Sequence, residues 1–227
     1  MMRAAPVARI FSAENDAMQS ARLKVYAIDG VTPVIEPGAF VHPDAVLIGD
    51  VIVEEGCYIG PCASLRGDFG RIIVRKGSNV QDGCILHSLP GFDSVIGTNG
   101  HIGHGAIIHS AQLEPNVLVG MNSVVMDHAR IGESAMIAAM SFVKAGAEIP
   151  PGHLAAGTPA RVLRELSEKE RAMKIEATRI YQELARRCLA SLQPVEPLSH
   201  FDPARPRVDA NLSLPLRTKS DTDKGIA

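Results

Sequence analysis

Aliphatic residues recur every six positions along most of this chain, and this period is the strongest constraint on its fold. The series runs from Ile35 to Leu65 and resumes after a three-residue insertion. With one residue lost after Ile108, it then continues to Ile149. Neither an amphipathic helix nor an alternating strand has a period of six. The nineteen positions are Ile35, Val41, Leu47, Val53, Ile59, Leu65, Val74, Val80, Leu86, Ile96, Ile102, Ile108, Leu113, Val119, Val125, Ile131, Ile137, Val143 and Ile149.

Such a period is typical of a parallel β-helix, in which each hexapeptide supplies one short strand and three hexapeptides complete a triangular coil. The composition agrees, because 46% of the residues are hydrophobic but only 4% are aromatic. A prism one strand wide on each face has room for aliphatic side chains and little for rings. Glycines such as Gly49, Gly60, Gly103, Gly120 and Gly132 suit its corners. We therefore predict an all-β solenoid.

The two ends of the chain depart from this period. We expect a disordered extension over 1–23, with translation starting at Leu23, and the β-helix domain over 24–160. Over 161–193 we expect a helix packed on the prism, because Ser167 and Glu170 form a capping box before an apolar-periodic stretch. The proline-rich and then polar segment 194–227 is expected to be a flexible tail.

The overall charge excludes several classes of function. Lys and Arg number 23 against 25 Asp and Glu, so no global field favours nucleic acid or an anionic membrane. No apolar run is long enough to span a bilayer, and four cysteines do not make a disulfide framework in a chain of 227 residues. We predict a cytoplasmic protein that binds neither nucleic acid nor membrane.

Three polar residues follow aliphatic positions that lie three strands apart, and therefore share one face of the prism. They are Arg66, His87 and His109. Adjacent coils lie roughly 4.7–4.9 Å apart, so the two histidines can converge on one metal ion. His104 follows the strand of Ile102 and belongs to another face, which one subunit cannot bring to the first. A threefold oligomer brings the two faces together.

We therefore predict a homotrimer in which His87 and His109 of one subunit and His104 of the next bind one metal. Three histidines that leave a position open for water are the pattern of a catalytic zinc site. Gln81, with Asn79 and Asp82 beside it, lies on the face of His104 and is predicted to orient a water or a substrate carbonyl. No residue is assigned to an organic cofactor. The unmatched histidines, expected in solvent or loops, are His42, His101, His128, His153 and His200.

These motifs resemble those of the gamma-class carbonic anhydrase family of left-handed β-helices. The matching residues are Arg66-Gly67-Asp68, Asn79-Val80-Gln81-Asp82, Leu86-His87, Gly103-His104 and His109. The resemblance implies a homotrimer with Zn²⁺ (or Fe²⁺ or Co²⁺) at each subunit interface, bound by His87, His104 and His109. It also implies an intersubunit network of Arg66, Asp68 and Asp82, which serves either interface pairing or catalysis, and a contact of Gln81 with the metal-bound water.

Within this family the chain is most similar to a subgroup of phenylacetic acid degradation and carnitine operon proteins. The segments CASLRGDFGRI, GHIGHGAIIHSA, VGMNSVVMD, VKAGAEIPPG and GTPARVLREL carry this similarity. The subgroup is associated with hydrolysis of coenzyme A thioesters in aromatic catabolism. The resemblance therefore implies an acyl-CoA thioesterase, in which a metal-bound hydroxide attacks the thioester carbonyl.

Alternative functions remain open. Strong gamma-class carbonic anhydrases carry glutamates where this chain has Phe69 and Pro90, which argues against rapid CO₂ hydration. The two phenylalanines Phe69 and Phe92 either line an acyl pocket or pack within the protein. Hexapeptide β-helices also include acyltransferases that use one histidine as a base, and a non-catalytic accessory trimer is a third class. Three histidines at metal-binding spacing favour the hydrolase.

Overall fold

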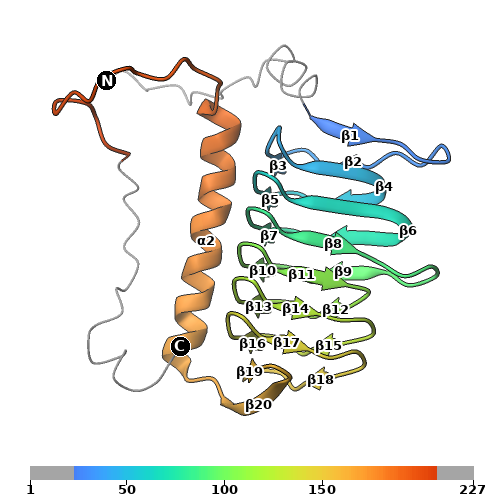
Figure 1. Cartoon of the computed structure of the whole chain (residues 1–227). Coiled ribbons are helices and arrows are strands. Elements are labelled where there is room, and N and C mark those ends of the chain that lie inside the picture. The colour runs from blue at the N-terminus through green and yellow to red at the C-terminus, as the bar shows by residue number, and fades with distance from the viewer. Residues whose placement is uncertain (1–22, 209–227) are drawn as a thin grey trace, which may run out of the picture.

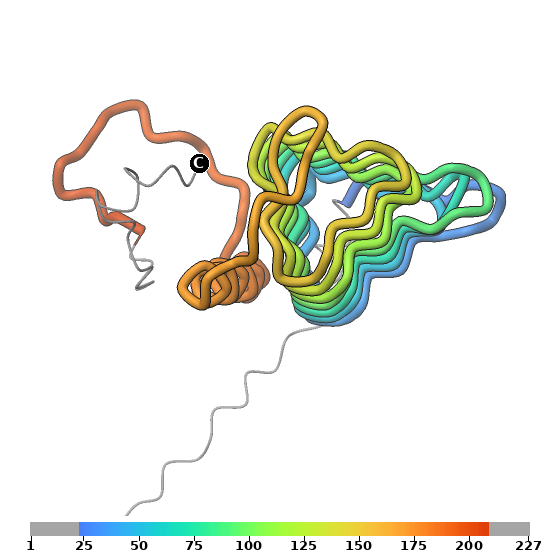
Figure 2. Tube along the Cα trace, turned by 90° about the horizontal axis from the view of Figure 1, so that it is seen from below, coloured from blue at the N-terminus to red at the C-terminus, as the bar shows by residue number. Residues whose placement is uncertain are grey.

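The computed structural model describes residues 23–208, and within them the chain coils into a three-sided prism with one long helix beside it (Figures 1 and 2). This is the left-handed β-helix of hexapeptide repeats that the sequence predicts. The proposed N-terminal extension and the end of the tail lie outside the described residues. No helix among residues 23–208 is long and apolar enough to cross a membrane.

The strands form two ladders of twelve and eight. The first face, here called the helix-covered face, carries β3 (Phe40–Val41), β5 (Tyr58–Ile59), β7 (Asn79–Val80), β10 (His101–Ile102), β13 (Leu118–Val119), β16 (Met136–Ile137), β19 (His153–Gly157) and β20 (Ala160–Glu165). All neighbours on this face are parallel except β19 and β20, which form an antiparallel pair at the end of the prism.

The long strands β4 (Val46–Val53) and β6 (Ser64–Val74) run across the corner between the other two faces. The histidine face carries the first halves of these strands with β1 (Lys24–Tyr26), β8 (Ile85–His87), β11 (Ile107–His109), β14 (Val124–Val125) and β17 (Phe142–Val143). The third face carries their second halves with β2 (Val34–Ile35), β9 (Ser94–Ile96), β12 (Gln112–Leu113), β15 (Arg130–Ile131) and β18 (Glu148–Ile149).

The aliphatic series forms the core of the prism. Eighteen of its nineteen members are buried in one cluster, and Ile35, at the open first coil, packs partly buried against them. Register explains the period, because Leu65 pairs with Leu86 and Leu86 with Ile108 on successive coils. Stacking identical inward positions in this way removes their apolar surface from water at roughly 25 cal/mol per Å².

Helix α2 (Glu168–Ser191) lies along the helix-covered face. It runs from the last coil back toward the first, opposite to the direction in which the coils follow one another (Figures 1 and 2). Its Ala185 is buried against Phe40 and Tyr58 of β3 and β5. A polar side chain adds a hydrogen bond to the same contact, because Gln182 Nε2 donates to the carbonyl oxygen of Gly77 at 2.9 Å. The apolar and polar contacts together fix the helix on this face.

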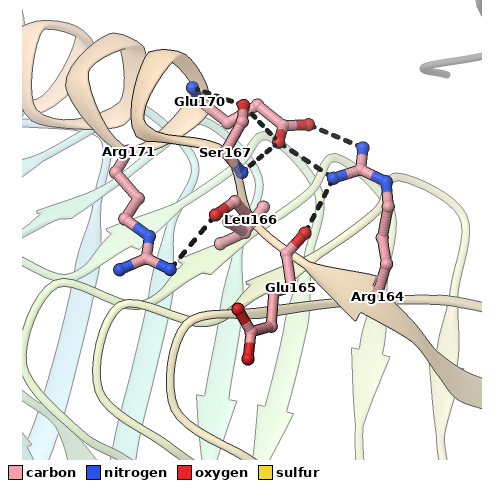
Figure 3. A network of polar contacts seen from close by, with 6 residues as sticks. All are labelled: Arg164, Glu165, Leu166, Ser167, Glu170 and Arg171. Carbon is pink, nitrogen blue, oxygen red and sulfur yellow. Dashed lines mark hydrogen bonds and ion pairs between the residues drawn. The ribbon is translucent and has the colours of Figure 1, made fainter.

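The start of α2 is held by a capping box that the sequence predicts (Figure 3). The backbone N–H of Glu170 donates to Ser167 Oγ at 3.3 Å, and the backbone N–H of Ser167 donates to Glu170 Oε2 at 2.8 Å. Arg164 adds two contacts of 2.8 and 2.9 Å to the same carboxylate. This arginine is the main reason that the pKa of Glu170 falls to about 2. The end of the prism and the first turn of the helix are therefore tied together.

Candidate metal centre

His87 and His109 lie in register on neighbouring strands of the histidine face, with Arg66 one coil before them. Nδ1 of His87 lies 3.0 Å from Nε2 of His109, and the ring centroids are 5.1 Å apart. His87 is mostly buried and His109 a quarter exposed. The stacking of strands therefore does what the spacing predicts, bringing two imidazoles from neighbouring coils together.

Each of these rings has an aspartate at its other nitrogen. His87 Nε2 lies 3.0 Å from Asp68 Oδ1, and His109 Nδ1 contacts Asp127 Oδ1. Arg66 Nη1 donates to the second oxygen of Asp68 at 2.7 Å. Burial by itself raises the pKa of the Asp68 carboxyl, but the hydrogen bonds from Arg66 and His87 outweigh it and hold that pKa below its usual value. Asp68 is thus an ionised acceptor that orients His87.

The two facing nitrogens have a consequence for charge. A neutral imidazole carries one N–H. If His87 and His109 donate theirs to Asp68 and Asp127, the nitrogens 3.0 Å apart both present lone pairs. Such an arrangement needs a proton or a metal cation between the rings. Two nitrogens bound tetrahedrally to zinc lie ~3.3 Å apart, so the pair is within a few tenths of an ångström of the spacing a cation requires.

His104 stands at a corner next to the helix-covered face, between two glycines. A Cβ on Gly103 would lie 2.8 Å from the backbone nitrogen of Met121, and Gly105 has a φ of +70°, a conformation that favours glycine. The two glycines allow the tight corner that projects the imidazole outward. His104 Nδ1 lies 3.0 Å from Asp82 Oδ2, and its Nε2 lies 3.4 Å from the hydroxyl of Tyr181 on α2.

The three predicted metal ligands thus share one feature, an aspartate at one ring nitrogen. At His87 and His109 this arrangement fixes the ring and turns the other nitrogen toward the facing ring, as in carboxylate–histidine–metal sites, whereas the other nitrogen of His104 lies beside the Tyr181 hydroxyl. Within residues 23–208 of a single chain, no three metal-binding side chains converge on one point. His87 and His109 contact one another, whereas His104 contacts neither of them in any described interaction. A complete set of three requires a second chain.

The sequence predicts that Gln81, with Asn79 beside it, orients a water or a substrate carbonyl. In the structure of the single chain, neither side chain is open to solvent. Both side chains point outward from the prism, but α2 covers them and both are buried. Gln81 Nε2 lies 2.9 Å from Asn79 Oδ1 and 2.8 Å from His101 Nε2, while its Oε1 accepts the backbone N–H of His104 at 3.2 Å. Gln81 therefore anchors the corner that carries His104.

The sequence predicts His101 in solvent or a loop, but the structure shows it buried. Its ring is buried under α2, with Asn79 Nδ2 3.2 Å and Thr178 Oγ1 3.4 Å from Nδ1. Burial, together with the nearby charges of Lys174 and His104, lowers the pKa of His101 to about 3. The ring is consequently neutral near pH 7 and acts as a fixed part of the helix contact.

Comparisons with known proteins agree with this architecture. A family model for the bacterial transferase hexapeptide, covering six repeats, matches residues 32–67. The carnitine operon protein CaiE of Escherichia coli K12 is 54% identical over 192 residues, covering 85% of this chain and 98% of that protein. The chain belongs to the CaiE family of hexapeptide-repeat proteins. CaiE of Salmonella agona is 53% identical over 186 residues, covering 82% and 94% of the two chains.

Solved structures place the CaiE-family fold among hexapeptide transferases. A candidate acetyltransferase of Bacillus cereus superposes with a TM-score of 0.72 at 35% identity, covering 73% of this chain and 96% of that one. A hexapeptide transferase family protein of Anaplasma phagocytophilum gives a TM-score of 0.70 at 37% identity, covering 73% and 98%. Hexapeptide β-helices commonly form trimers. The family resemblance drawn from the motifs is thereby confirmed.

Sequence reasoning about this CaiE-family chain overlooked Asp127, the partner of His109. The signal was present, because Asp127 follows the aliphatic position Val125 by two residues on the next coil of the same face. Tyr181 lies in the predicted helix, and its hydroxyl lies beside the imidazole of His104. No repeat spacing could reveal this contact, since it depends on how α2 docks.

Proposed function

We propose that this protein is a metal-dependent hydrolase of coenzyme A thioesters whose metal is shared between subunits of a trimer. The observation that carries the proposal is the His87–His109 pair, in which two imidazoles with aspartates behind them face each other at 3.0 Å. Imidazole donors suit zinc, iron and cobalt. His104, with Asp82 behind it, is the third ligand and comes from the neighbouring subunit.

The outer surface of the histidine face supports assembly with a second copy. Ile85, Ile107, Val124 and Phe142 lie in register on successive coils and alternate with inward-pointing residues, so their side chains point outward. Ile85 is 46% exposed, and the other three are half-buried. An outward apolar ladder beside the histidine pair is expected to be covered by protein. A neighbouring subunit that brings its His104 to the pair would cover it.

When bound, such a metal supplies a water of lowered pKa and a positive charge for the oxygen of the attacked carbonyl. The residues of this chain prepare that site. Asp68 and Asp127 fix the rings of His87 and His109, and Arg66 keeps Asp68 ionised. Asp82 fixes His104, while Gln81 and Asn79 hold its corner from within the helix contact. In the assembled trimer we also assign Arg66, Asp68 and Asp82 to an intersubunit network.

Two alternative functions are an acyltransferase and a carbonic anhydrase. The transferase names of the structural neighbours and of the matching family model favour an acyltransferase, in which His104 paired with Asp82 is the general base. The other alternative is CO₂ hydration. The Phe69 ring lies 5.4 Å from the His87 ring, centroid to centroid, at the position where a strong gamma-class carbonic anhydrase has a glutamate, and this argues against rapid CO₂ hydration. A hydrolase loses activity when the metal is removed, whereas an acyltransferase with a histidine base does not.

The decisive experiment assays purified protein against a panel of coenzyme A thioesters. Because the relatives are named for a carnitine operon and the sequence resembles proteins of aromatic catabolism, the panel spans carnitinyl, crotonyl, phenylacetyl and acetyl thioesters. CO₂ hydration and transfer to amine acceptors are measured in parallel. Hydrolysis that is lost with a chelator and restored by Zn²⁺, Fe²⁺ or Co²⁺ is the expected result. Less than about one metal per subunit, with activity indifferent to chelators, would refute the proposal.

Sharing between subunits is tested by complementation. His87→Ala and His104→Ala each destroy one half of the site, so neither homotrimer is expected to bind metal. A mixed trimer places an intact His87–His109 pair beside an intact His104 at some interfaces, and co-expression of the two variants is expected to restore part of the metal content. His200→Ala, which alters an exposed histidine in the segment after α2, is the matched control. If the mixture stays metal-free although mixed trimers form, the shared site is wrong.

A further inference from the structure

Two loops at the corner between the histidine face and the third face interrupt the six-residue repeat. One is residues 67–71 within β6, and the other is residues 88–93 between β8 and β9. In Figure 1 the bend of β6 and the β8–β9 turn project beyond the shorter coils below them, and Figure 2 shows the same projection down the prism axis. They account for the two places where the aliphatic series exceeds its six-residue step, which are nine residues from Leu65 to Val74 and ten from Leu86 to Ile96.

Each loop presents one phenylalanine to solvent. Phe69 is 59% exposed and Phe92 is 47% exposed. The Phe69 ring lies 5.4 Å from the ring of His87, centroid to centroid, and the Phe92 ring meets the edge of His128 at 4.4 Å. His128 directly follows Asp127, the partner of His109. Phe69 therefore lies beside the histidine pair, and Phe92 lies beside the residue that follows Asp127, from the neighbouring loop on the same side of the prism.

The loops that hold these rings are locked together. A Cβ on Gly70 would lie 1.9 Å from the carbonyl oxygen of Phe92, so only glycine lets the two backbones approach this closely. Leu89 donates its backbone N–H to Ser110 Oγ at 2.6 Å, and Ser94 Oγ donates to the carbonyl oxygen of His87 at 2.8 Å. The phenylalanines are thus held in place by the backbone, without being buried by their own chain.

We propose that Phe69 and Phe92 form an acyl subsite that takes an uncharged, apolar acyl group of the thioester. The inference rests on the proposed hydrolase function, because the acyl carbonyl must lie at the His87–His109 pair for the group attached to it to reach the two rings. Because the backbone that carries the rings is fixed in advance, binding an acyl group need not order these loops.

Binding of non-hydrolysable thioether analogues of acyl-CoA tests the subsite independently of turnover. For the wild-type trimer, calorimetry is expected to give at least tenfold tighter binding of the phenylacetyl analogue than of the acetyl analogue. An analogue that carries a trimethylammonium group is expected to bind no better than acetyl. Equal affinity for all three, or a preference for the trimethylammonium analogue, would overturn the proposal without the need for any variant.

Variants then assign the preference to these two rings. Phe69→Ala and Phe92→Ala, alone and combined, are expected to lower the phenylacetyl-to-acetyl ratio of affinities and of kcat/KM, by tenfold or more in the double variant. Phe201→Ala, at an exposed ring in the segment after α2, is the matched control and leaves both ratios unchanged. Light scattering verifies the trimer in each case. If an alanine variant fails to assemble, Phe69→Leu and Phe92→Leu, which keep apolar bulk, are expected to retain much of the preference.

The outcomes separate the subsite from the function. Hydrolysis with an unchanged ratio in an assembled double variant refutes the subsite and leaves the hydrolase standing. Analogue binding that depends on Phe69 and Phe92 without hydrolysis of any thioester supports the subsite and refutes the hydrolase. Loss of assembly in both alanine and leucine variants, with wild-type affinity indifferent to the acyl group, shows that the rings serve the subunit interface and overturns the subsite.

Discussion

Nδ1 of His87 and Nε2 of His109 lie 3.0 Å apart on successive coils, and each ring contacts an aspartate through its other nitrogen. If both rings donate their N–H to these aspartates, the facing nitrogens both present lone pairs and need a proton between them when no cation is bound. Metal binding at this pair must therefore displace a proton.

Proton release is the first prediction. Titration of the metal-free protein with Zn²⁺ near pH 7 is expected to release close to one proton for each site filled, because the proton between the facing nitrogens leaves as the metal enters. Calorimetry in phosphate and in Tris measures this number, since the two buffers have different heats of ionisation. Metal binding with the same heat in both buffers would contradict the shared proton.

The aspartate behind His109 gives the second prediction. Asp127→Asn removes the charged acceptor that orients the His109 ring, and loss of such a partner typically weakens metal affinity by about 10–100-fold. Competition with a chromophoric chelator measures the change. Asp93→Asn, which alters an exposed carboxylate in the β8–β9 loop, is the control and leaves the affinity unchanged. An unaltered affinity in Asp127→Asn would remove this carboxylate from the metal site.

The solenoid and the histidine pair could be predicted from the sequence because both follow from local spacing. In a β-helix a fixed step in sequence is a fixed step in space, so the spacing from Leu65 to Leu86 to Ile108 also places the residues that follow them. The same rule identified His104 as belonging to another face. The left-handed sense of the coil rests on the family resemblance, since a period of six does not specify it.

The surroundings of Gln81 and His101 could not be predicted in this way. Repeat spacing indicates that both point outward, which for a bare prism means toward water. They are buried because α2 docks on that face through Thr178 and Tyr181, at a separation of some 77 residues. Contacts between a solenoid and a segment outside the repeat depend on tertiary packing and leave no trace in the period.

The contact between the two projecting loops gives the third prediction. Gly70→Ala places a methyl group where the Phe92 carbonyl oxygen lies, so the loops must separate. The expected loss is several °C in Tm, on the order of 2 kcal/mol, as for other overpacked sites. Gly146→Ala is the control, since a Cβ there meets nothing within 4 Å and only the backbone with a φ of +68° is strained. Gly146→Ala thus measures the cost of backbone strain alone, and a Gly70→Ala variant as stable as the wild type would contradict the close approach of the two loops.

Acid stability gives the fourth prediction, through His101. Burial lowers its pKa to about 3 in the folded chain from an ordinary value of 6.5. Between these values the unfolded chain binds a proton that the folded chain does not, so stability falls as the pH drops from 6.5 toward 3. His101→Gln, which stays neutral, is expected to lose less stability over this range in thermal melts at fixed protein concentration. His200→Gln, at an exposed ring, should melt like the wild type at every pH.

The buried lysine of α2 gives the fifth prediction. Lys174 is 4% exposed and donates to the carbonyl oxygen of Asn99, and burial lowers its pKa to about 8 from 10.5. The unfolded chain therefore holds the extra proton between pH 8 and 10.5, and folding stability rises with pH across that window. At roughly 1.4 kcal/mol per pH unit, burying the charge costs about 3 kcal/mol below pH 8.

Lys174→Met removes this cost together with the charged hydrogen bond to Asn99, which offsets about 2 kcal/mol of it. The variant is expected to be more stable than the wild type at pH 7, and the difference is expected to shrink as the pH approaches 10.5. Thermal melts at matched trimer concentration, taken at each pH unit from 7 to 10, follow this difference. Lys144→Met, at an exposed position, shows no such trend. A constant difference at all pH values would mean that Lys174 acts through packing and not through its charge.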